Sequence, residues 1–321
     1  MNKIVFYQER TFGDKFNVTF EFIKQNWKLM LRYFAYVVLP LSFVAEFFME
    51  AMMKNVMTLA TNPEELMNLI PSYGGFFLVS IAVYLWMGAV SFSLLQVYNA
   101  RPDGLQNIVF ADFKPLLGRN VWRLVKSGLA LSLVLLVVMI LAGCLFALQM
   151  PVIAAVVYLV CMALMIPFVL FAPVYIFEDI PLWQAFARSF RLGWHTLGGI
   201  LALGIVLMIL TAIISFVCTL PWEICYLLKS FFVVNQGNAD SAFNGVPFML
   251  LQYLLGVLMM LARFLLLAIF YVSISYLYSH AAEKLDQMSV AEGVDHFEEM
   301  GDKIRMPTTI NCKLSIVNYQ L

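Results

Sequence analysis

The chain has 321 residues, of which 62% are hydrophobic and only 12% are charged. Because about 25% of the residues in a soluble domain are charged, this composition excludes the ordinary soluble class. The 20 basic residues balance the 20 acidic ones, so we expect no nucleic-acid partner, and the positions of the charges matter more than their sum.

An amphipathic helix is predicted at the start of the chain. Thr11 and Asp14 have the spacing of a capping box, and apolar residues then follow at steps of three and four. Such a helix can lie in the headgroup region, with its aromatic rings towards lipid and its lysines towards water. The alternative is a helix that packs against a neighbouring domain. The apolar positions are Phe12, Phe16, Phe20, Ile23 and Trp27.

Six later stretches are expected to cross a membrane, which takes about 20 helical residues. The clearest is the run of 51 residues from Ser127 to Phe177, which contains no Asp, Glu, Lys, Arg or His. A turn at Pro151 divides this run into a helical hairpin. Residues 1–285 then form a polytopic membrane domain, followed by a short cytoplasmic tail, 286–321. The predicted crossings are about 31–52, 73–97, 124–148, 152–177, 197–220 and 249–277.

The positions of the basic residues predict the orientation of these crossings. Thirteen Lys and Arg residues lie in the segments on one side, and only Lys54 and Lys229 lie on the other. By the positive-inside rule, the side with thirteen is cytoplasmic. Both chain ends should therefore lie in the cytoplasm, which an even number of crossings requires.

A basic–aromatic motif precedes the first, third and fifth crossings, 15 to 19 residues after a capping residue in each case. Tryptophan prefers the headgroup level, and each neighbouring cation gains about 1 kcal/mol from anionic lipid. We interpret the pattern as a threefold repeat of an amphipathic cytoplasmic helix followed by a hairpin. The alternative is that any crossing entered from the cytoplasm tends to begin in this way. The motifs are Lys24-Gln-Asn-Trp27-Lys28, Arg119-Asn-Val-Trp122-Arg123 and Arg191-Leu-Gly-Trp194-His195.

The segment Asp179-Ile-Pro-Leu-Trp-Gln-Ala-Phe-Ala-Arg-Ser-Phe-Arg-Leu-Gly-Trp194 carries a family resemblance. With the general helix-hairpin pattern, which covers about residues 10 to 285, it resembles bacterial six-helix proteins related to the membrane domain of glycerophosphoryl diester phosphodiesterases. The resemblance implies an integral domain of a bacterial cytoplasmic (inner) membrane. The catalytic part of such phosphodiesterases is a separate soluble barrel, for which this chain has no room, so the resemblance implies no activity.

The residues that carry most catalytic chemistry are scarce in this chain. Its three histidines are His195, His280 and His296, and none lies in a HExxH pattern or one helical turn from another histidine. No GxSxG, Walker or GxGxxG pattern is present either. We therefore expect no enzyme activity, no cofactor and no metal site.

Arg263 is the most unusual residue of the predicted crossings, with 22 uncharged residues before it and 16 after it. A lipid-facing charge at such a position costs about 2.5 kcal/mol or more, so Arg263 should face the other helices. Glu46 of the first crossing is the candidate partner. Two interpretations are open: an ion pair that joins the first crossing to the sixth, or a substrate or ion pathway lined by Arg263. Gly198 and Gly199 are expected to let helices approach closely.

The sequence thus predicts an all-α membrane protein with six transmembrane helices, three cytoplasmic amphipathic interfacial helices and a pseudo-threefold helix-hairpin repeat. The predicted function is non-catalytic: to organise the bilayer or partner proteins at the cytoplasmic face. The alternative is a carrier for a lipid-like or amphiphilic substrate, which a wide apolar groove lined by Arg263 and Tyr271 would favour. The expected partners are membrane lipids with anionic headgroups, together with a protein partner or further copies of the chain.

Overall fold

The computed structural model describes residues 3–59, 66–236, 245–288 and 290. These residues form helices joined by turns, and no strand occurs among them. Most of the predicted tail, 286–321, lies outside the described residues. The helices are α1 (Phe12–Leu59), α2 (Leu66–Ala100), α3 (Phe110–Ala147), α4 (Pro151–Met165), the 3-10 helix η2 (Ile166–Leu170), α5 (Phe171–Phe177), α6 (Leu182–His195), α7 (Leu197–Gln236) and α8 (Val246–Asp286).

Six helical stretches in the described residues are long and apolar enough to cross a membrane, as the sequence predicts. Four of the predicted crossings each lie within one helix, and the third, 124–148, ends one residue beyond α3. The fourth comprises α4, η2 and α5 in succession, because Pro167 has no amide hydrogen to continue the α-helical bonding and the chain tightens into a 3-10 turn. The helix that contains the fifth crossing, α7, continues to Gln236, well past the predicted end of that crossing at residue 220.

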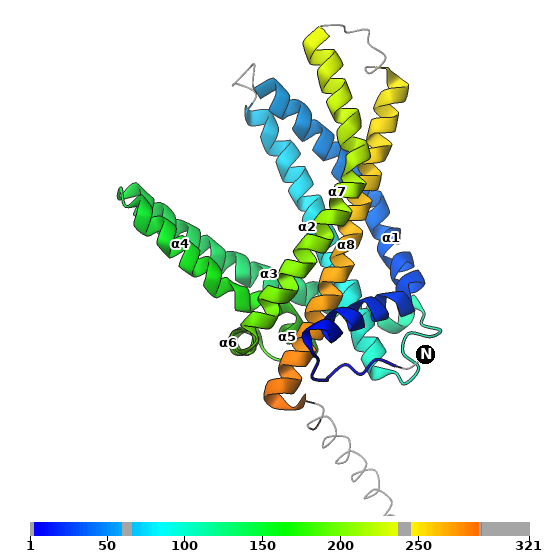
Figure 1. Cartoon of the computed structure of the whole chain (residues 1–321), viewed down its shortest axis with the longest axis vertical. Helices are drawn as coiled ribbons and strands as arrows, with labels where there is room; N and C mark the ends of the chain where they lie inside the picture. The colour runs from blue at the N-terminus through cyan, green and yellow to red at the C-terminus, as the bar shows by residue number, and fades with distance from the viewer. Residues whose placement is uncertain (1–2, 60–65, 237–244, 289, 291–321) are drawn as a thin grey trace, which may run out of the picture.

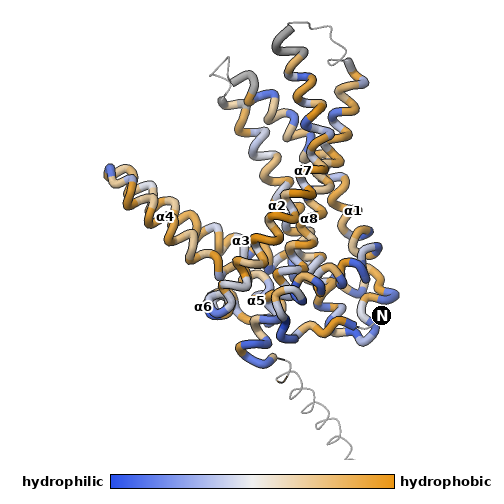
Figure 2. Tube along the Cα trace, in the orientation of Figure 1, coloured by the Kyte–Doolittle hydropathy of each residue, from blue (hydrophilic) through white to orange (hydrophobic). Residues whose placement is uncertain are grey.

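The helices form a bundle and a separate hairpin (Figure 1). Helices α1, α2, α7 and α8 run along the long axis of the molecule, and α8 contacts the other three. The α3–α4 hairpin leaves this bundle and points away from it, and it is hydrophobic along its length (Figure 2). Its side chains are correspondingly exposed in the isolated chain: Leu133 by 62% and Leu159 by 66%. The hairpin therefore offers both of its helices to lipid or to another protein.

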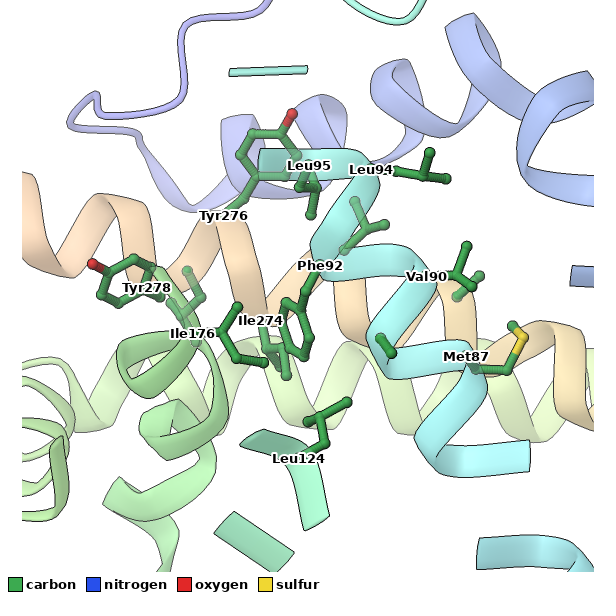
Figure 3. Packing of buried hydrophobic residues seen from close by; sticks show 14 of the residues in the cluster. Met87, Val90, Phe92, Leu94, Leu95, Leu124, Ile176, Ile274, Tyr276 and Tyr278 are labelled. Atoms are coloured by element: carbon green, nitrogen blue, oxygen red, sulfur yellow. The ribbon is translucent and has the colours of Figure 1, made fainter. Parts of the chain in front are cut away.

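Part of the hydrophobic core lies where the hairpin joins the bundle (Figure 3). Side chains from α2, α3, α5 and α8 meet there, and Phe92, Leu94, Tyr276 and Tyr278 are fully buried. This end also holds the N-terminal segment, α6 and the C-terminal end of α8 (Figure 1). We call it the basic end, because the Lys and Arg residues of the predicted cytoplasmic segments lie there.

Only one of the three predicted interfacial helices is a separate element, α6. The first is continuous with its crossing in α1, since residues 15–39 contain no Gly or Pro to interrupt the helix. Its beginning nevertheless lies across the bundle before α1 turns along the long axis (Figure 1). The second is part of α3, which runs on through Pro115. The three predicted repeat units thus differ in their helix boundaries.

Candidate functional site

Glu46, deep in α1, is almost completely buried, with 1% of its surface exposed. Its carboxylate accepts a hydrogen bond from the indole Nε1–H of Trp222 in α7 at 3.1 Å. The same carboxylate lies directly over Gly256 of α8, where any Cβ atom would overlap it. Glu46 therefore joins three helices of the bundle, with a glycine providing the space for its side chain.

Arg263 forms no hydrogen bond or ion pair with Glu46, and the two interact only through their charges. Arg263 is exposed on the surface of α8, and its guanidinium donates a hydrogen bond to Thr219 Oγ1 of α7 at 3.3 Å. Gly256, which marks the level of Glu46, is seven residues from Arg263 and therefore about 10 Å farther from the basic end. The structure thus gives the two charged groups different partners and separates them along the bundle. The sequence could not show this offset, because the sequence alone does not determine how far one helix is shifted along its axis relative to another.

Tyr271, the other residue of the predicted carrier groove, lies against α2. Its hydroxyl donates to the backbone carbonyl oxygen of Tyr84 at 3.0 Å, and its ring lies next to Gly88. Arg263 instead bonds to α7. The two residues therefore bond to different neighbouring helices.

The tryptophans of the three basic–aromatic motifs share one feature: each is at least half exposed. The exposed fractions are 51% for Trp27, 60% for Trp122 and 53% for Trp194. Two of the rings have an ammonium group nearby, Lys28 at 5.8 Å from the centroid of Trp27 and Lys126 at 5.3 Å from that of Trp122. An exposed indole beside a cation is the arrangement expected at a membrane–water interface.

The basic residues of the motifs have different partners. Arg119 and Arg123 of α3 both form ion pairs with Asp179, which has a left-handed backbone conformation with φ of 54°. Arg191 of α6 pairs with Asp286 at the end of α8, at 2.7 Å. The second and third motifs therefore also connect the helices of the basic end to one another.

The first motif has no such connection. Lys24 and Lys28 are exposed and form no ion pair with the part of the chain that the structure describes. His195, the last residue of the third motif, is likewise exposed and has no ion pair there. These side chains are available to groups outside the chain.

A partly buried polar network at the basic end was not predicted from the sequence. Glu178, whose side chain is 7% exposed, forms an ion pair with Arg188 of α6 and accepts a hydrogen bond from the hydroxyl of Tyr278 at 3.0 Å. Arg188 also pairs with Asp286 at 3.1 Å. Burial alone would lower the pKa of Arg188, but the hydrogen bond and charge of Glu178 and the charge of Asp286 outweigh it and raise the pKa above its ordinary value. The network joins α5, α6 and α8.

The N-terminal segment, residues 3–11, packs against the same end of α8. The backbone amide of Arg10 donates to Nδ1 of His280 at 3.0 Å, and the guanidinium of Arg10 lies 5.2 Å from the ring centroid of Tyr276. The guanidinium also donates to the carbonyl oxygen of Phe6 at 3.0 Å. Burial lowers the pKa of Arg10 from its ordinary value. The chain start is therefore part of the folded basic end.

The described residues contain no group of three or more His, Cys, Asp or Glu side chains placed to hold a metal ion. Comparisons with protein-family models, with curated proteins and with solved structures each found no match. The described geometry consists of a tightly connected basic end, three exposed tryptophans and a hairpin that points away from the bundle.

Proposed function

We propose that this chain is a non-catalytic multi-pass protein of a bacterial inner membrane that organises the bilayer, or partner proteins, at the cytoplasmic face. Its six long apolar helices are consistent with a multi-pass membrane protein. The single observation that carries the proposal is the set of three half-exposed tryptophans at the basic end, each next to basic residues in the sequence. Such a belt binds the headgroup region of a leaflet over a wide area.

The connections within the basic end support the same proposal. Because ion pairs join α3 to the Asp179 turn and α6 to α8, the tryptophans of the second and third motifs are held on a common base. The apolar α3–α4 hairpin extends from this base away from the bundle (Figures 1 and 2). A rigid base with a projecting hairpin increases the amount of lipid in contact with the chain.

The proposal predicts a preference for anionic lipid around the protein. A cation near the membrane surface gains about 1 kcal/mol from anionic lipid. Averaged over all the lipid molecules that touch the protein, this gain corresponds to about a twofold preference for anionic over zwitterionic lipid. Electron spin resonance of spin-labelled phosphatidylglycerol and phosphatidylcholine, with the full chain in mixed vesicles, measures this ratio. Changing both Lys24 and Lys126 to Gln should bring the ratio closer to one. Lys54→Gln is the control, because Glu50 already pairs with Lys54 at 3.3 Å.

No preference in the unchanged protein, or an equal fall in the ratio with Lys54→Gln, would contradict this function.

The carrier is the second candidate, because Arg263 is exposed in the middle of α8 rather than enclosed. A carrier for a lipid-like substrate should speed the movement of a fluorescent phospholipid between the leaflets of the same vesicles. An organiser of the bilayer should leave that rate unchanged.

A further inference from the structure

A cavity of about 390 Å³ lies between α1, α2 and the first residue of α3. Its volume is within the range of small-molecule sites, about 300–1,000 Å³. Arg32 is the only charged residue that lines it, and on α1 it is the lining residue nearest to the basic end. The remaining walls are apolar or aromatic: Tyr33, Tyr36, Val37, Trp86 and Phe110.

The aromatic walls of this cavity are held in place by their own contacts. The indole Nε1–H of Trp86 donates to the backbone carbonyl oxygen of Tyr33 at 3.2 Å, which fixes α2 against α1. The ring of Tyr33 lies 6.0 Å from that of Phe110 and 4.9 Å from that of Phe113, which fixes the start of α3. Tyr36, by contrast, is 84% exposed and forms the open side. The cavity is therefore a preformed groove that opens to the surroundings of the bundle.

Arg32 differs from the other arginines that the structure describes. All seven of those have a hydrogen bond or an ion pair within the chain, and their partners include Phe6, Asp112, Asp179, Asp286 and Thr219. Arg32 has neither within the described residues, although it is exposed at the edge of an apolar groove. A guanidinium has five donors in a planar fork that fits a phosphate, so an anion is the partner that this position lacks.

The position of Arg32 along α1 places it near a leaflet surface. It follows the half-exposed Trp27 by five residues, which is about 7.5 Å along the helix. Lys28 lies one turn closer to the basic end on the same face of α1. The apolar walls Tyr36, Val37 and Trp86 then extend from Arg32 in the direction of the hydrocarbon core.

We propose that this groove binds one molecule of an anionic phospholipid, with the phosphate on Arg32 and an acyl chain against Tyr36, Val37 and Trp86. The two ends of the groove match the two chemical parts of such a lipid, an anion and a hydrocarbon chain. A charged headgroup also explains why Arg32 alone among the described arginines is unpaired, since an apolar helix from a second copy of the chain would leave its guanidinium without a partner. A discrete site goes beyond the general lipid preference proposed above, since it holds one molecule at a fixed position.

Native mass spectrometry of the full chain tests this site. The protein is first placed in nanodiscs of equal parts phosphatidylglycerol and phosphatidylcholine, then released into mild detergent, which removes loosely bound lipid. We expect one retained phosphatidylglycerol. Arg32→Gln should reduce its retention about tenfold, because charge-assisted hydrogen bonds are lost. Val37→Trp, which fills the groove while keeping Arg32, should abolish retention of either lipid.

Lys54→Gln is the control, because Lys54 is also a cation of α1 but lines no such cavity and already pairs with Glu50 at 3.3 Å. It should retain phosphatidylglycerol as the unchanged protein does. The proposal is overturned if the unchanged protein retains no lipid, if it retains both lipids equally, or if Arg32→Gln and Lys54→Gln behave alike. Boundary-layer lipid is lost in detergent, so failure here is distinguishable from failure of the spin-resonance experiment.

Discussion

Replacing Glu178 by alanine should lower the free energy of unfolding by about 3 kcal/mol, the largest effect we expect from a single charge. The side chain of Glu178 is only 7% exposed, and its removal leaves the guanidinium of Arg188 and the hydroxyl of Tyr278 without this partner. Deleting one member of a buried ion pair costs about 3–5 kcal/mol. We expect the lower end of that range, because the Arg188 side chain is 23% exposed and keeps Asp286.

Thermal unfolding of the purified protein in detergent measures this effect. Arg191→Ala is the matched control, because it removes an ion pair of the same cluster whose arginine is 54% exposed, and such pairs contribute about 1 kcal/mol or less. The double change Glu178→Leu with Arg188→Met should recover part of the loss, since no buried charge is then left alone. Equal losses for Glu178→Ala and Arg191→Ala would show that the network does not stabilise the basic end.

The second large effect is expected at Gly193, where α6 crosses η2. A Cβ atom at Gly193 would lie 2.6 Å from the Cα atom of Pro167, closer than any real contact between such atoms. Because the obstacle is backbone, a small side-chain movement cannot relieve it. Gly193→Ala should therefore cost about 2–3 kcal/mol through overpacking.

Gly198→Ala should have the opposite effect and raise the free energy of unfolding. Nothing lies within 4 Å of the position that its Cβ would occupy, so the close approach expected from the sequence at Gly198 is found instead at Gly193. Alanine in an open helical position is favoured over glycine by about 1 kcal/mol. Melting temperatures of the two variants check both expectations, and a Gly193→Ala protein as stable as Gly198→Ala would refute the close contact of α6 with η2.

The helices themselves could be predicted from the sequence because the signal for each is local. A run without charge, such as Ser127 to Phe177, can be buried in lipid as a helix whatever its neighbours are. The tryptophan motifs still stand as a prediction of interfacial anchors, which depends only on nearby residues, and the structure adds that all three indole rings are at least half exposed. The boundary between the first predicted interfacial segment and its crossing could not be predicted from the sequence, because no Gly or Pro marks where α1 changes direction.

The contacts between helices could not be predicted in the same way. Glu178 and Tyr278 are 100 residues apart, and only the packing of α5 against α8 brings them together. The pairing of Arg263 with Glu46 required both to lie at the same depth, whereas Glu46 is level with Trp222 and Gly256. Charges at the ends of otherwise apolar segments, such as Glu178 and Asp286, were the one sequence signal for the buried network.

The accessibility of introduced cysteines tests the central claim most directly, that six crossings place the basic end in the cytoplasm. In a chain whose five native cysteines are replaced by alanine, single cysteines are introduced for Asn17 and Gln106 at the basic end and for Val246 at the opposite end. All three positions are exposed. A membrane-impermeant maleimide should label the cysteine at position 246 in intact cells, and those at 17 and 106 only in inverted vesicles. Labelling of position 17 or 106 from outside intact cells would contradict the account.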